Sequence, residues 1–68
     1  MANKIEYANY NKYGYRVLTL VIDTENKHLI LYHGQTAPIS KPDKKTSKKF
    51  IREQFELLSN SGYTTETH

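Results

Sequence analysis

The stretch from residue 15 to residue 33 constrains the fold most, because it predicts a β-hairpin that is apolar on both faces. Residues 15–22 and 28–33 are rich in β-branched and apolar side chains, and the polar residues 23–27 separate them. Successive side chains of a strand point to opposite faces. In the first strand, Val17 and Val21 point to one face, and Leu18, Leu20 and Ile22 point to the other. In the second strand, Leu29 and Leu31 point to one face, and Ile30 and Tyr32 point to the other. Both faces of this hairpin must therefore be covered.

A single amphipathic helix covers only one face of a hairpin. The other face needs the terminal segments, a second copy of the chain or a protein partner, since large exposed apolar patches are unusual in monomers. The chain has 68 residues and no cysteine, so neither a disulfide nor a thiolate zinc site supplements its small core. We therefore expect a homodimer. The alternative is that the Tyr-rich N-terminal segment folds back over the second face.

Further strands are expected on either side of this hairpin in the sequence. Residues 5–10 predict an edge strand, and residues 11–14 turn the chain after it. Residues 63–67 have a strand-like composition and would either add one more edge or fray. In the hairpin turn, Asn26 is the residue suited to the left-handed backbone conformation.

A helix is expected over much of residues 40–60. Ser40 followed by Asp43 resembles a capping box, and Asp43 or Thr46 are alternative N-caps. Gly62 is the expected left-handed stop. The core-facing stripe at helical spacing is Phe50, Ile51, Phe55, Leu57 and Leu58. The chain is thus predicted to be a single α+β domain, a small antiparallel sheet of three or four strands with one C-terminal amphipathic helix packed on one face.

The sequence lacks the patterns that catalysis and cofactor binding require. It has no Gly-rich phosphate loop, no nucleophile elbow and no His-Glu-x-x-His pair. His28 and His33 are five residues apart on one strand, so they point to opposite faces and cannot share a metal ion. Asp23 and Glu25 are explained as solvated turn residues. We therefore expect a protein that is not an enzyme and needs no metal or cofactor.

The apolar segments are too short for secretion or membrane insertion. The N-terminus has no apolar signal region, and residues 17–22 fall far short of a membrane span. A cytoplasmic location is expected. The abundance of Lys, Asn, Ile and Tyr, whose codons are A/T-rich, favours a low-GC bacterium or one of its phages or mobile elements as the source.

Positive charge is concentrated in one short segment. Five lysines and one aspartate in residues 41–49 give a local charge of +4, against +3 for the whole chain. Lysines at a helix start oppose the helix dipole and add to the free N–H groups that attract anions there. Nucleic acid is the commonest polymeric carrier of such an anion. The candidate anion-binding residues are Lys41, Lys44, Lys45, Lys48, Lys49 and Arg52.

Residues 41–49, the lysine segment, also have a purely structural interpretation. On a solvated helix face, Lys49 would pair with Glu53, and Arg52 with Glu56, at i,i+4 spacing.

Tyrosines form a second candidate surface near the N-terminus. The basic residues Lys12 and Arg16 are interleaved with these tyrosines, a pattern that allows nucleobases to stack on the rings. Cross-strand packing or a protein interface explains the tyrosines better than stacking does, because few basic residues lie among them. The residues concerned are Tyr7, Tyr10, Tyr13, Tyr15 and Arg16.

Two classes of function fit these features. The first is a small nucleic-acid-associated accessory factor that docks phosphates on the lysine segment. The second is a protein-interaction module, such as a phage- or plasmid-type inhibitor of a host protein, which would use the apolar face and the tyrosines. The concentration of lysine favours the first, and the two apolar faces of the hairpin favour the second; we prefer the first by a narrow margin.

Overall fold

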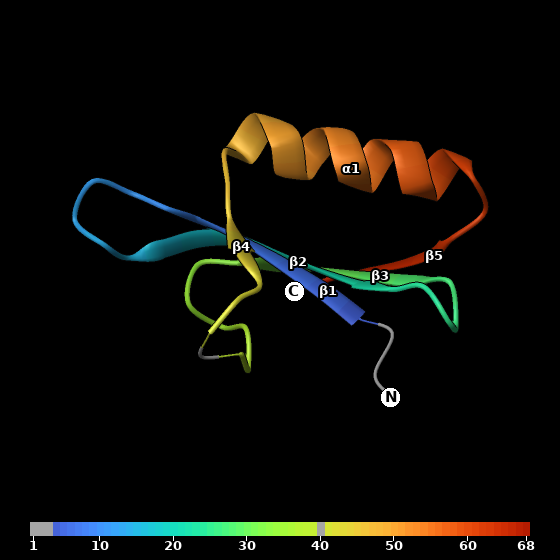
Figure 1. Ribbon diagram of the computed structural model, residues 1–68, viewed down its shortest axis with the longest axis horizontal. Helices are drawn as coiled ribbons and strands as arrows, with labels where there is room; N and C mark the ends of the chain where they lie inside the picture. The colour runs from blue at the N-terminus through green and yellow to red at the C-terminus, as the bar shows by residue number, and fades with distance from the viewer. Residues whose placement is uncertain (1–3, 40) are drawn as a thin grey trace.

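The computed structural model describes residues 4–39 and 41–68, which form a five-stranded sheet with one helix on one face (Figure 1). The strand order is β4-β1-β2-β3-β5. β1 to β3 form an antiparallel meander, whereas β4 is parallel to β1 and β5 is parallel to β3. The elements are β1 Lys4–Tyr10, β2 Arg16–Asp23, β3 His28–His33, β4 Lys44–Lys45, α1 Lys48–Asn60 and β5 Thr64–Thr67.

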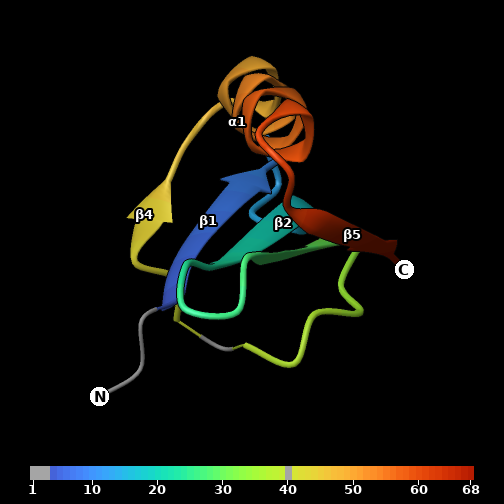
Figure 2. The ribbon, with the colours of Figure 1, turned by 90° about the vertical axis from the view of Figure 1, so that its right-hand side faces the viewer.

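The α+β class is confirmed, but the expected antiparallel sheet of three or four strands is wrong. The two outer strands are parallel to their neighbours because each is reached by a connection that crosses the sheet. The chain leaves β3, passes beneath the sheet to the β1 edge, and returns over the opposite face as α1 (Figures 1 and 2). The strand predicted over residues 5–10 is consequently internal, between β4 and β2. The uncertain tail forms β5.

The predicted hairpin is confirmed as β2 and β3, with one correction in its turn. Lys27, with φ of 52°, takes the left-handed conformation expected of Asn26. Asn26 is bound instead by the carboxylate of Asp23. Its backbone N–H donates to Asp23 Oδ1 at 3.1 Å, and its side-chain amide donates to Oδ2 at 3.0 Å.

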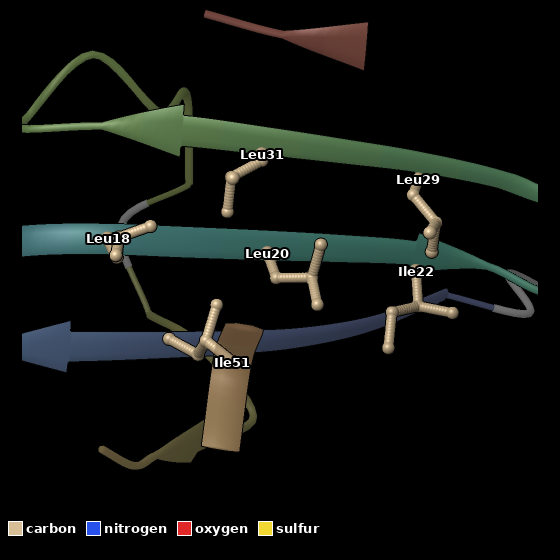
Figure 3. Close-up of a cluster of buried hydrophobic side chains, with 6 residues drawn as sticks. All are labelled: Leu18, Leu20, Ile22, Leu29, Leu31 and Ile51. Atoms are coloured by element: carbon tan, nitrogen blue, oxygen red, sulfur yellow. The ribbon is translucent and has the colours of Figure 1, made fainter. Parts of the chain in front are cut away.

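The core lies between α1 and the helix-facing side of the sheet (Figure 3). Ile51 is fully buried, and Phe55 and Leu58 pack beside it, as the stripe predicted. Leu57 is an exception, with 59% of its surface exposed, because it lies about 120° around the helix from Ile51. The buried cluster is Leu18, Leu20, Ile22, Leu29, Leu31 and Ile51.

The second face of the hairpin is covered by the connection between β3 and β4, which was not among the covers considered (Figure 2). Ala8 and Thr19 are completely buried, and Val21 almost so. Ala37, in the connection, is buried as well. The Tyr-rich segment is not a lid, because residues 4–10 are a strand of the sheet itself.

Arg16 fastens this connection to the sheet. Its Nη1 donates to the carbonyl oxygen of Ile39 at 2.6 Å, and its Nη2 donates to that of Ala37 at 3.2 Å. The β1–β2 register shifts beside Tyr10, which pairs with Arg16 and leaves Val17 as an extra residue. Such a bulge re-aims side chains, and here it directs the guanidinium to the connection.

The helix begins later than expected. Its N-cap is Ser47, whose Oγ accepts from the Phe50 N–H at 3.1 Å. Asp43 and Thr46 are not caps, because residues 43–46 pair with β1 and the helix begins only at Lys48. Ser40, the remaining candidate, lies outside the described residues. Gly62 is confirmed as the left-handed stop, with φ of 100°.

The Asp23 turn predicts a pH dependence of stability. The side-chain and backbone hydrogen bonds from Asn26 lower the pKa of Asp23, and Lys4 adds to the effect while desolvation opposes it. A carboxyl whose pKa is lower in the folded state contributes stability above its unfolded pKa and loses it as pH falls through the folded value. We therefore expect the free energy of unfolding to fall between about pH 5 and pH 2.

The matched control is Asp23→Asn, which keeps an acceptor oxygen but does not titrate. Urea unfolding across this range should show a shallower loss of stability for the variant than for the wild type. Parallel curves would mean that the Asp23 carboxylate does not stabilise the turn.

Candidate nucleic-acid interface

The lysine segment is held against the open edge of β1 by hydrogen bonds on both sides of β4. The backbone N–H of Asp43 donates to the Glu6 carbonyl at 2.9 Å, and that of Thr46 donates to the Ala8 carbonyl at 2.8 Å. The Asp43 carboxylate accepts from the Glu6 N–H at 2.9 Å, and the Asn9 amide donates to the Thr46 carbonyl at 2.8 Å. Asp43, the one acid within the lysine segment, is therefore hydrogen-bonded to the backbone of β1.

This pairing places two lysines beside aromatic rings on opposite faces of the sheet. Consecutive strand residues alternate in direction. Lys44 Nζ accordingly lies 5.9 Å from the ring centroid of Phe50, and Lys45 Nζ lies 5.1 Å from that of Tyr10. Both distances are in the range of cation–π attraction. The edge of the sheet thus carries positive charge and aromatic surface together.

The start of α1 adds two more lysines. Lys48 and Lys49 are exposed in its first turn, which contains no acid. Arg52 is exposed about one turn further along. Lys41 is exposed in the connection before β4. Free helical N–H groups and these cations therefore combine at one place.

The ion pairs expected within the helix do not form. Among residues 4–39 and 41–68, the salt-bridge contacts join Glu66 to His28 and His68, which are ionic only when the histidines are protonated and lie outside the lysine segment. Lys49 and Arg52 are therefore not neutralised by Glu53 and Glu56. The lysine segment is accessible to an external anion.

The tip of the β1–β2 hairpin presents two tyrosines on an ordered turn. Asn11 Oδ1 accepts from the backbone N–H of Tyr13 at 2.9 Å and from that of Tyr15 at 3.0 Å. Tyr13 is 72% exposed and Tyr15 is 58% exposed. Lys12 Nζ lies 5.3 Å from the Tyr13 ring centroid.

The other candidates at the N-terminus are used within the fold. Tyr7 is half-buried and packs edge-to-face on Phe50, with ring centroids 5.2 Å apart. The guanidinium of Arg16 is bound to the β3–β4 connection. Residues 11–14 were expected to turn the chain, but the role of the Asn11 side chain as acceptor was not predicted, although an Asn that accepts from N–H groups further along the chain is a known turn signal.

The tip, β4 and the first turn of α1 lie toward the same end of the long axis (Figure 1). The turn after β2, the end of α1 and β5 lie toward the other end. The second group contains the acids Glu25, Glu56 and Glu66 and one lysine, Lys27. Charge is therefore separated along the molecule, and we refer to the tip, β4 and the helix start together as the basic end.

The described part of the chain forms no pocket and no group of three or more His, Asp or Glu residues able to hold a metal ion. His28 and His33 lie on opposite faces, as predicted, since they pair with Asp23 and Leu18 respectively. No helix among residues 4–39 and 41–68 has the length and apolarity to cross a membrane. No protein-family model, curated protein or solved structure matches the chain.

The position of the lysines at the helix start has a measurable consequence for stability. Replacing Lys48 and Lys49 by Glu puts favourable charge at the positive end of the dipole. We expect each change to add about 0.3–1 kcal/mol to the free energy of unfolding, measured at low ionic strength.

The control is Arg52→Glu, beyond the first turn, where the dipole effect has largely decayed. An equal gain from this control would attribute the effect to general relief of positive charge. A loss of stability in the double variant would contradict the geometry of the helix start.

Proposed function

We propose that this chain is a non-enzymatic, nucleic-acid-associated accessory protein that docks the phosphate backbone on its basic end. The observation that carries the proposal is the pairing of β4 with β1, which brings Lys44 and Lys45 beside the rings of Phe50 and Tyr10. Lysines near a phosphate chain bind it by releasing its condensed counterions. A surface with cations and exposed rings supplies both charge and stacking.

Two further features support a polymeric anion as the ligand. The basic end is an open surface in the described part of the chain, with no pocket that would enclose a small molecule. Its lysines come from three separate segments, so the positive field extends over more than one phosphate spacing. A cytoplasmic location and a bacterial or phage source belong to the same proposal.

The expected homodimer remains a prediction, but the structural reason for it is different. The second apolar face is already covered within the chain. β5 is the outermost strand on its side, and its four residues are all exposed, which makes it the edge where two copies would pair. The molar mass in solution, 8.0 kDa for a monomer, tests this.

The proposal predicts a salt-dependent affinity for random-sequence DNA or RNA. Replacing Lys44 and Lys45 by Gln removes two charges from the basic end. We expect weaker binding and a slope of log affinity against log salt that is shallower by about one unit per lost phosphate contact. Gel retardation over a series of salt concentrations measures both quantities.

The control replaces Lys4 and Lys27 by Gln, which lowers the net charge equally but away from the basic end. This variant should keep the salt slope of the wild type. Equal losses in the two variants would show that only net charge matters. An absence of retardation even at low salt would sink the proposal and favour the protein-interaction module, with an acidic partner for the same lysines.

A further inference from the structure

The tip of the β1–β2 hairpin is ordered by its own hydrogen bonds. Besides the two N–H groups bound by its side chain, Asn11 donates its N–H to the Tyr15 carbonyl at 2.9 Å and accepts from the Gly14 N–H at 3.0 Å. Gly14 has φ of 87°, a conformation that glycine adopts without strain. Tyr13 and Tyr15 therefore extend from a fixed backbone, which lowers the entropy cost of using them in binding.

Lysine–aromatic contacts occur at the hairpin tip and again where β1 meets β4. Lys12 lies over Tyr13 at the tip, and Lys45 lies over Tyr10 where β1 meets β4. A cation and a ring are thus paired at each of these two places, and a nucleic-acid strand likewise carries a phosphate with each base. Rings stack on bases, and ammonium groups attract phosphates.

We infer that the ligand of the basic end is single-stranded nucleic acid, with bases stacked on Tyr13 and Tyr15 and phosphates held by the lysines. This inference rests on the proposed function and adds the class of substrate. In a duplex the faces of the bases are occupied by their neighbours, so the exposed rings would have no stacking partner. A single strand presents base faces and phosphates together.

Oligonucleotides that differ only in their bases test the inference directly. The probes are a thymidine 12-mer, a 12-mer of the same backbone with abasic sites at its central positions, and a 12-base-pair duplex. We expect the wild-type protein to bind the thymidine strand about five- to hundredfold more tightly than the abasic strand for each base that stacks. The salt slopes for the two strands should be similar, because their phosphates are the same.

Tyrosine variants assign the base preference to the tip. The Tyr13→Leu, Tyr15→Leu double variant should lose the preference for the thymidine strand and keep the salt slope. The Tyr13→Phe, Tyr15→Phe variant, which keeps the rings, should retain the preference. Both rings are largely exposed, so the melting temperatures of the variants should match that of the wild type.

The outcomes separate the two levels of the proposal. Equal affinity of the wild type for thymidine and abasic strands, with a normal salt slope, would overturn stacking and leave phosphate docking intact. Tighter binding of the duplex than of the thymidine strand would also overturn the inference. Failure to bind any of the three probes would remove the proposed function itself. The wild-type comparison needs no variant, so a misfolded variant cannot obscure the result.

Discussion

β2 is buried on both of its faces, and this double burial determines how the rest of the chain runs. Leu18, Leu20 and Ile22 lie under α1, while Thr19 and Val21 lie against the β3–β4 connection. The chain must therefore cross beneath the sheet once and above it once. These two crossings explain why a meander of three antiparallel strands gains a parallel strand at each edge. A chain without cysteine thus covers both faces with its own connections.

The same crossings assemble the basic end. The connection beneath the sheet is fastened by Arg16 and arrives at the free edge of β1, where the lysine segment docks as β4. The return crossing begins at once as α1, which places Lys48 and Lys49 beside that edge. Lysines and tyrosines from distant parts of the sequence are brought together because the hairpin needs two covers.

Much of the fold follows from local pattern. Period-2 alternation predicted β2, β3 and their two apolar faces, and helical spacing predicted the packing of Ile51, Phe55 and Leu58. The helix start was not predictable from local chemistry. Thr46 and Ser47 are both good N-cap residues, and only the pairing of residues 43–46 with β1 selects Ser47.

The candidate site was only partly predictable for a related reason. Lys44 and Lys45 have low strand propensity and form β4 through tertiary pairing, which no local pattern reveals. No local pattern in residues 34–39 shows that this segment passes beneath the sheet. The lysine and tyrosine groups were each recognised as candidates, whereas their contact depends on that path.

Amide hydrogen exchange in Arg16→Met tests most directly whether the fastened connection docks the lysine segment. Methionine preserves the unbranched aliphatic part of the arginine side chain and removes both hydrogen bonds to the connection. The amides of Asp43 and Thr46, which donate to β1, should exchange at least about tenfold faster than in the wild type, relative to the amide of Leu20 in the same protein. Unchanged relative protection at Asp43 and Thr46 would show that β4 docks without this fastening and would contradict the account.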